Sequence, residues 1–466
     1  MAENVLLIHW HDLGRHLRCY GAAGVDSPTM DALASQGIRF SNAHATAPLC
    51  SPARGSLFTG RYPHSNGLTG LAHHGFEYHD DVRTLPQILG ENGWYSALFG
   101  MQHESGDPQR LGFDEFDISD SECDHVVARS QEWLRTVGVD EQRGQQPFLL
   151  TAGFFETHRP YPPEDYVHAD PKNVSVPAFL PDARPVREDL AGLLGSISKA
   201  DAAVGRLLDT LAELGLDRST WVVFVTDHGL AFPRAKSTLY SEGTGVALIV
   251  RPPTDRNITP FVYDDLFSGV DLTPTLLDLL GVGIPEAVEG FSHAETITGI
   301  ASATVRDEAF AEKTYHDNFD PIRAIRTDRY SYIENYADRP ALSLPLDIRD
   351  SPSARALDGS QDLPRAPREL YDLLADPLEL NNLIDDPRVA DVLADLRERL
   401  NRWRTDTADV LPTEAEGNRF ALEFMARYRR QLDNIDEQNA ERSLPSRRPR
   451  ASERELRGKQ TTADQP

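Results

Sequence analysis

A short stretch of the chain places a cysteine where neither packing nor metal binding by several cysteines explains it. Residues 50–54 read Cys-Ser-Pro-Ala-Arg and are followed by a segment that contains Gly-Arg-Tyr-Pro. Cys50 has no apolar helical pattern around it, and the other cysteines, Cys19 and Cys123, are distant in sequence. Such a sparse, odd set argues against a disulfide framework or a structural zinc site. Cys50 is therefore a candidate for chemistry, with Arg54 as either a clamp on it or an ordinary surface arginine.

Four polar clusters supply further chemistry-bearing residues, and each follows a predicted strand: His11-Asp12, Gln102-His103-Glu104, His158-Arg159 and Asp227-His228. Carboxylates and imidazoles together suit a divalent cation. An Asp-His pair alone also fits a helix cap with a turn. Because a His-Asp pair follows the first strand and an Asp-His pair a later one, we favour a metal site.

Three more residues could act on a substrate. His103 and His158 are candidates for general acid and base catalysis near neutral pH, although both also fit ordinary loop histidines. Lys236 follows Asp227-His228 in the same predicted loop, in a chain that has few lysines. It is a candidate for contact with an anion, and the alternative is a solvated surface charge.

The elements that must position these residues alternate between helix and strand. Apolar runs predict buried strands at 5–10, where only His9 interrupts the run, and at 221–225. Helical patterns with Gly stops lie between such runs, for example at 28–36. This alternation predicts a large, mostly parallel sheet with helices on both faces. Ligands of such sheets bind beyond the carboxyl ends of the strands, where the four clusters stand.

The chain is expected to divide into three parts. We predict a catalytic α/β domain over 1–304, a small α+β domain over 305–412, and a C-terminal helix with a polar tail over 413–466. The segment 342–366 is rich in Pro, Ser and Asp and predicts a surface loop. Beyond Arg442 the sequence has almost no apolar residues, which is typical of a disordered tail.

Composition limits the classes of partner. The 466 residues carry a net charge of -26, so a role in nucleic-acid binding is not expected. An anionic small substrate remains compatible with that charge, because a local cationic pocket can form in an acidic protein. The N-terminal residues show neither a signal-peptide pattern nor a membrane span, and we expect a cytoplasmic protein without membrane contact. The oligomeric state is left open.

The motifs together resemble a known family. The pattern Cys-x-Pro-x-Arg with its Gly-Arg-Tyr-Pro extension, "NVLLIHWHDLG" near the N-terminus, "VTDHG" after a later strand and "ELYDLLADPLELNNL" near the end are similar to type I sulfatases of the alkaline phosphatase superfamily. The resemblance covers roughly residues 4–409. The order of "NGLTGLAHH", "GMQHE", "FFETHRPY" and "FPRAKSTLY" is most similar to the heparan N-sulfatase (sulfamidase) branch.

The resemblance implies that a formylglycine-generating enzyme oxidises Cys50 to a Cα-formylglycine. One hydroxyl of the hydrated aldehyde then attacks sulfur, and the other lets the sulfated intermediate collapse and expel sulfate. This divides one hard step into two easier ones. The implied reaction is hydrolysis of a sulfate ester or sulfamate on a small substrate, with an N-sulfo or O-sulfo sugar favoured.

The resemblance also implies a role for each candidate residue. Those at the metal are Asp12, Cys50, Asp227 and His228. His11, next to Asp12, is expected as a further metal ligand from its own position and not from the resemblance. Those at the reacting group are Arg54, which steadies the formylglycine, His103, which handles the hydroxyl proton, His158, which protonates the leaving group, and Lys236, which binds sulfate oxygens.

Two departures from the family pattern affect these expectations. His11 stands where the family usually has a second Asp, and Met101 stands where many members carry a lysine. Calcium is the default metal of the family, but imidazole ligands suit manganese or another transition metal better. Two alternatives stay open: a phosphomonoester, phosphodiester or phosphonate-ester hydrolase of the same superfamily, and a catalytically silent binding protein.

Overall fold

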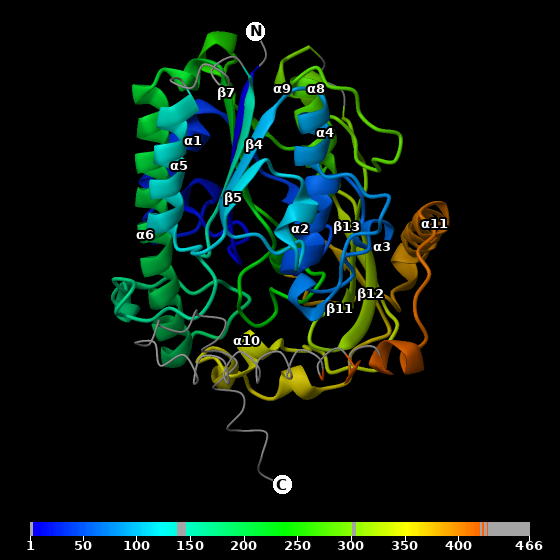
Figure 1. Ribbon diagram of the computed structural model, residues 1–466. Helices are drawn as coiled ribbons and strands as arrows, with labels where there is room; N and C mark the ends of the chain where they lie inside the picture. Colours follow the sequence, from blue (N-terminus) through cyan, green and yellow to red (C-terminus); the bar gives the residue numbers. More distant parts are fainter. Residues whose placement is uncertain (1–2, 138–145, 301–303, 420–421, 424–425, 427–466) are drawn as a thin grey trace.

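The architecture consists of a large sheet covered by helices and a smaller sheet beside it (Figure 1). The computed structural model describes residues 3–137, 146–300, 304–419, 422–423 and 426. The predicted disordered tail beyond Arg442 lies outside these residues. Among the described helices, none is both long and apolar enough to cross a membrane.

The large sheet is mostly parallel, as predicted. Its strands lie in the order β5 (Glu115–Asp117), β4 (Tyr95–Gly100), β6 (Phe148–Gly153), β1 (Asn4–Trp10), β7 (Thr220–Thr226), β8 (Leu248–Arg251), β2 (Ile38–Phe40) and β9 (Phe261–Tyr263). Every described pairing in this sheet is parallel except those of β8, which runs antiparallel to β7 and β2. The first part of the order, β4-β6-β1-β7, is a continuous block of parallel neighbours.

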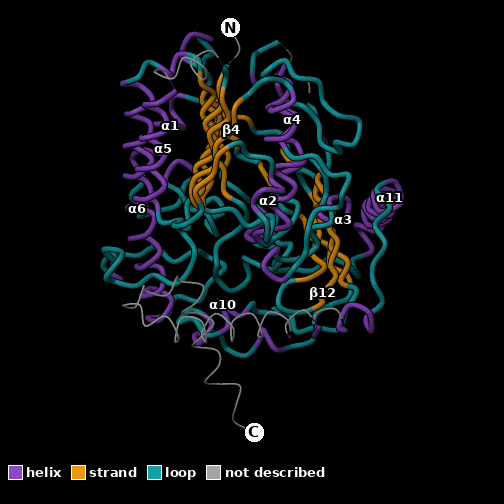
Figure 2. Tube along the Cα trace, in the orientation of Figure 1, coloured by secondary structure: helices purple, strands orange, loops and turns teal. Residues whose placement is uncertain are grey.

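Helices cover both faces of this sheet (Figure 2). One face packs against α1 (Pro28–Gln36), α5 (Cys123–Val137) and α6 (Arg184–Glu213), and the other against α2 (Cys50–Thr59), α4 (Leu85–Glu91) and α8 (Leu272–Leu279). Side chains alternate across a strand, so β1 serves both cores. Leu6 and Ile8 pack on the α6 side, whereas Val5 and Leu7 pack on the α8 side.

Local sequence signals explain where individual helices begin and end. Thr84 and Gln87 form a reciprocal capping box at the start of α4. Gly215, in the left-handed region with a φ of 68°, follows α6. Gly37 after α1 has a different reason: a Cβ there would lie 2.6 Å from the carbonyl oxygen of Val250. These stops allow the chain to return to the sheet.

The second sheet is antiparallel and contains β11 (Ala309–Tyr315), β12 (Phe319–Arg326), β13 (Tyr330–Asn335) and β14 (Arg368–Asp372). The helix α11 (Ala390–Asp406) packs on it through Leu396, Leu400 and Trp403. This arrangement confirms the predicted small α+β region. The boundaries at 304/305 and 412/413 stay predictions.

Short elements complete the described chain. They are the two-stranded pair β3 (Ala43–His44) and β10 (Phe267–Ser268), and the single-turn helices α3 (Pro63–Asn66), α7 (Ser241–Thr244), α9 (Ala294–Ile297) and α10 (Leu346–Arg349). The helix α10 lies within 342–366, which we predicted to be a surface loop. Ile348 and Ser353 in this segment are fully buried, whereas Leu363 is 61% exposed, so the prediction holds for only part of the segment.

Candidate active site

The four polar clusters meet at one edge of the large sheet. They follow β4, β6, β1 and β7, which are consecutive neighbours in the sheet. The ring centroid of His11 lies 4.6 Å from that of His158, 6.0 Å from that of His103 and 6.2 Å from that of His228. The carboxyl ends of parallel neighbouring strands thus bring residues from distant parts of the chain together.

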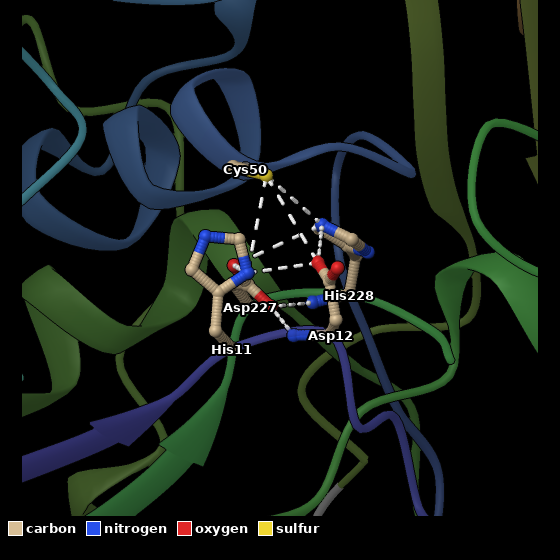
Figure 3. Close-up of side chains that lie close together, drawn as sticks. All are labelled: His11, Asp12, Cys50, Asp227 and His228. Atoms are coloured by element: carbon tan, nitrogen blue, oxygen red, sulfur yellow. Dashed lines mark hydrogen bonds and ion pairs between the residues drawn. The ribbon is translucent and has the colours of Figure 1, made fainter. Parts of the chain in front are cut away.

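Five buried side chains with metal-binding atoms form the centre of this edge (Figure 3). Each of His11, Asp12, Cys50, Asp227 and His228 offers one atom, and all these atoms lie within 4.8 Å of one another. Asp12 Oδ1 lies 2.8 Å from His11 Nδ1 and 3.0 Å from His228 Nε2. The backbone N–H of Asp12 donates to Asp227 Oδ1 at 2.9 Å, which joins the ends of β1 and β7.

Two features of the backbone position the side chains of Asp12 and Cys50 in this cluster. Asp12 has a left-handed φ of 58°, so the chain turns sharply directly after β1. Cys50 is the first residue of α2, a helix whose residues are all buried. A helix N-terminus favours a thiolate because unpaired backbone N–H groups carry partial positive charge. Cys50 Sγ lies 3.5 Å from His228 Nε2.

The cluster carries an excess of negative charge that buried protons balance. Burial alone would lower the pKa of His11, but Cys50, Asp227 and Asp12 raise it to about 9. Burial likewise opposes protonation of His228, yet Asp227 and Asp12 raise its pKa to about 10. The Cys50 pKa lies well below its usual value, because His11 and Lys236 outweigh the effect of burial.

This donor set fits a divalent cation. Carboxylate oxygens and imidazole nitrogens converge in a buried space, and the two histidines bind protons there against the cost of burial. A metal cation would provide the same positive charge once the imidazoles are neutral. The imidazole nitrogens favour a transition metal over calcium, which takes oxygen ligands.

Arg54 is a buried residue of this site and not a surface arginine. It is 1% exposed, and its Nε and Nη2 lie 3.2 Å and 3.1 Å from Asp227 Oδ2. Its Nη1 donates to Nδ1 of His9, which burial and the charge of Arg54 keep neutral by lowering its pKa. Sequence reasoning missed this role for His9, although the interruption of an apolar strand by a histidine was the visible signal.

His103 is paired with a histidine that sequence reasoning did not select. His103 Nε2 lies 2.7 Å from Nδ1 of His73, and the two rings stack with centroids 4.9 Å apart. The backbone N–H of His103 donates to the carboxylate of Glu104. Burial lowers the pKa of His103, which favours the neutral imidazole. A neutral ring can accept a proton, as a general base must.

His158 and Lys236 lie near the second carboxylate oxygen of Asp12, Oδ2, whereas His11 and His228 lie near Oδ1. His158 Nδ1 donates to the carbonyl oxygen of Arg159 at 2.5 Å, and its Nε2 lies 3.5 Å from Asp12 Oδ2. Lys236 Nζ lies 2.8 Å from the same oxygen and 2.7 Å from Asp347 Oδ2. Lys236 is therefore buried in the site and is not a solvated surface charge. Asp347 was not selected from sequence because it lies in the segment predicted to be a surface loop.

Comparisons with known proteins show which family the sequence matches. The family model described as Sulfatase matches residues 3–282, and the one described as N-sulphoglucosamine sulphohydrolase, C-terminal, matches residues 228–356. Human N-sulphoglucosamine sulphohydrolase is 28% identical, with 87% of this chain and 91% of the relative covered. Choline-sulfatase of Rhizobium meliloti (strain 1021) is 26% identical, with 90% of each covered.

Solved structures share the fold. One is described as a complex with its substrate D-glucosamine-2-N,6-O-disulfate, and it matches with a TM-score of 0.68 at 18% identity over 88% of this chain and 99% of that one. Another, from work on glycosaminoglycan metabolism by Bacteroides thetaiotaomicron, matches with a TM-score of 0.70 at 22% identity over 90% and 99%.

Proposed function

The chain belongs to the sulfatase family and is a sulfuric ester hydrolase, and from this premise we propose that it releases sulfate from an N-sulfated or O-sulfated amino sugar. Cys50, oxidised to formylglycine by a formylglycine-generating enzyme, is the proposed nucleophile. The human relative is named for N-sulphoglucosamine, and one solved structure of the same fold holds a glucosamine disulfate. These names support a sulfated sugar and leave the choice between sulfamate and sulfate ester open.

The observation that carries the proposal is the place of Cys50. Its Sγ stands at the start of α2, 4.0 Å from Asp12 Oδ1, within the group of buried metal-binding atoms. A hydrated aldehyde at this position offers two hydroxyls on one carbon, and one of them can act as a nucleophile. A cysteine with only a structural role does not require carboxylates and imidazoles around its sulfur.

We propose that His11, Asp12, Asp227 and His228, together with residue 50, hold one divalent metal. A metal held by these residues would supply positive charge that stabilises the charge on the transferred group and on the nucleophile at residue 50. Because two of the donors are imidazoles, manganese or another transition metal is proposed to serve at least as well as calcium.

The surrounding residues have separate proposed tasks. Arg54, fixed by Asp227 and His9, steadies the formylglycine. His103 takes the proton of the attacking hydroxyl, and its contact with His73 holds the ring in place. Lys236 supplies positive charge to the oxygens of the transferred group.

His158 is the proposed acid for the leaving group. With Nδ1 donating to a backbone carbonyl, its Nε2 is the atom left to face the reacting group. Protonation at Nε2 lets it donate a proton to a departing oxygen or nitrogen. A positioned acid of this kind matters most when the leaving group is a poor one.

The test is to produce the protein with a formylglycine-generating enzyme and to identify the Cys50 peptide by mass spectrometry. The same material is offered N-sulfoglucosamine, glucosamine O-sulfates and an aryl sulfate, and released sulfate is measured. We expect an aldehyde at residue 50 and release from at least one sugar. Release from the aryl sulfate alone would remove the sugar proposal. Full activity with an unmodified thiol would remove the formylglycine proposal.

A further inference from the structure

The buried cation Lys236 is held between two carboxylates from distant parts of the chain. Asp12 comes from the end of β1, and Asp347 comes from the single-turn helix α10. The side chain of Lys236 is 2% exposed and that of Asp347 is 9% exposed. Asp347 Oδ2 also lies 4.0 Å from His158 Nε2, the proposed acid. A carboxylate thus lies beside both groups proposed to handle the substrate.

The backbone around Asp347 is anchored on both sides. Before it, the N–H of Leu346 donates to Asp317 Oδ2 at 2.6 Å. After it, the backbone N–H and hydroxyl of Ser353 donate to Asp189 Oδ2 at 3.2 Å and 2.6 Å. Asp189 in turn forms a bidentate ion pair with Arg159, the residue after His158, at 2.6 Å and 2.7 Å.

Ion pairing keeps Asp347 charged. Burial would raise its pKa, but Lys236 and then His158 lower it below the usual value. The negative charge of Asp12 raises the pKa of Asp347, whereas the buried His316 lowers it. The carboxylate therefore brings one full negative charge to the position of Lys236.

This charge has different consequences for two otherwise similar groups. A sulfate ester and a phosphate monoester are both tetrahedral, but near neutral pH the first carries one negative charge and the second almost two. The repulsion between two charges is proportional to their product, so Asp347 opposes the phosphate about twice as strongly as the sulfate. Burial strengthens the difference because water screens it less.

We propose that Asp347 is a specificity-determining residue that selects a transferred group with one negative charge, a sulfate ester or sulfamate, against phosphate monoesters. The inference rests on the proposed function, since it takes Lys236 as the cation that binds the transferred group. Asp347 lowers the positive charge of the pocket so that a monoanion is accepted and a dianion is disfavoured.

The first test measures binding without turnover. Two ligands of matched shape are used at about pH 8.5: benzenesulfonate, which is a monoanion, and phenylphosphonate, which is then mainly a dianion. Both are titrated by calorimetry into Cys50→Ala protein with Asp347 intact or changed to Asn. We expect Asp347→Asn to improve the affinity for phenylphosphonate relative to benzenesulfonate by about 10-fold.

Matched variants separate this effect from others. Asp350→Asn makes the same charge change at an exposed position three residues further on, where the side chain of Asp350 is 64% exposed. Asp347→Glu keeps the charge in the pocket. Both should leave the ratio of affinities unchanged. If Asp347→Asn does not fold, as judged by its melting transition, Asp347→Ser is the second neutral variant. An unchanged ratio in the folded neutral variants would overturn the proposal.

The second test uses the matured enzyme. The ratio of kcat/KM for an aryl phosphate to that for an aryl sulfate should rise about 10-fold or more in Asp347→Asn. Sulfate release with an unchanged ratio overturns the role of Asp347 and leaves the proposed function standing. If no sulfate ester or sulfamate is hydrolysed while the affinity ratio still depends on Asp347, the proposed function fails and the selectivity of the pocket stands.

Discussion

Two groups of metal-binding side chains, one at each sheet, differ in how the cations of the chain contact them. At the large sheet, the group is His11, Asp12, Cys50, Asp227 and His228, and at the small sheet a second group consists of His64, Glu312 and Asp409. In the second group, Arg323 donates from Nε and Nη2 to Asp409 at 2.8 Å and 2.7 Å, and Nη2 lies 3.2 Å from Glu312. The chain itself supplies the cation there.

The first group has cations only at its margins. Arg54 contacts Asp227, and Lys236 contacts Asp12. The raised pKa values of His11 and His228 mean that protons on these two rings balance the remaining negative charge of the group. The same ligand types therefore make a structural cluster where one arginine contacts two of the carboxylates, and a candidate metal site where each cation contacts only one carboxylate of the group. Burial and donor type alone do not separate the two.

The largest effect is expected at Cys50, the one member of the first group that has no counterpart in the second. Cys50→Ala should lower turnover by about 10⁵-fold, because removal of a nucleophile removes the covalent route. Steady-state sulfate release and a thermal melt measure activity and stability together. Cys19→Ala is the matched control and should keep activity. Near-normal turnover by the Cys50 variant would contradict the assignment of the first group as catalytic and the second as structural.

Removal of divalent metal should come next. Chelation is expected to lower activity by about 10³-fold, since a bound cation contributes several kcal/mol to stabilising the reacting charge. Manganese should restore activity at least as well as calcium. Metal affinity should rise with pH up to about pH 10, because His11 and His228, with pKa values of about 9 and about 10, must lose protons to bind the cation.

Calorimetric titration of the metal at several pH values checks that trend. His11→Ala should weaken metal binding, with a smaller loss in His11→Asp, which keeps a ligand at that position. Recovery by calcium alone, together with no effect of His11→Ala, would refute the role given to His11.

In the second group, loss of the central cation should affect folding and not chemistry. Arg323→Met removes the cation that Asp409 and Glu312 share and leaves them only Arg404 and His64, so it should lower the free energy of unfolding by up to about 3–5 kcal/mol. Urea unfolding measures it, and activity per folded molecule should stay near that of the unchanged protein. Arg402→Met on α11, where the side chain is 61% exposed, should cost less than about 0.5 kcal/mol. Loss of activity without loss of stability in Arg323→Met would reverse the assignment.

A smaller effect is expected at the margin of the first group. His158→Ala should lower activity about 10²-fold on sugar sulfates or sulfamates and little on an activated aryl sulfate, because only poor leaving groups need the proton. Parallel kcat/KM measurements on the two substrate types decide this. An equal loss on both would remove His158 from the acid role.

The smallest effect concerns acid stability of the second group. Burial would raise the pKa of Asp409, but hydrogen bonds and charge from Arg323 lower it to about 2, below the ordinary value of an aspartate. A lowered folded pKa adds stability above the unfolded pKa, and this stability is lost as pH falls through the folded pKa. Asp409 should therefore contribute about 2 kcal/mol above pH 4 and lose it by about pH 2.

Unfolding titrations of the unchanged protein and of Asp409→Asn over this pH range measure the contribution. The difference in stability between the two should shrink as pH falls from about 4 to about 2. If the stability difference between the two proteins stays constant across the range, the charge of Asp409 does not contribute to stability through Arg323.

The sequence by itself determined the layout of this protein. Apolar runs and helix caps are local signals, so strands such as 5–10 and the helix at 28–36 could be read without the fold. The rule that parallel strands present their carboxyl ends at one edge then placed the four polar clusters together. Similarity of short motifs pointed to the sulfatase family, because Cys50, Pro52 and Arg54 lie within five consecutive residues.

Only the tertiary structure decided which partners complete the site. His9 and Arg54 are 45 positions apart, His73 and His103 are 30 apart, and Lys236 and Asp347 are 111 apart. Asp347 lies in a polar segment that has the composition of a surface loop, and it enters the site because Asp317 and Asp189 hold that segment down. Which long-range contacts form depends on how helices and loops pack together, and no local pattern in the chain records that.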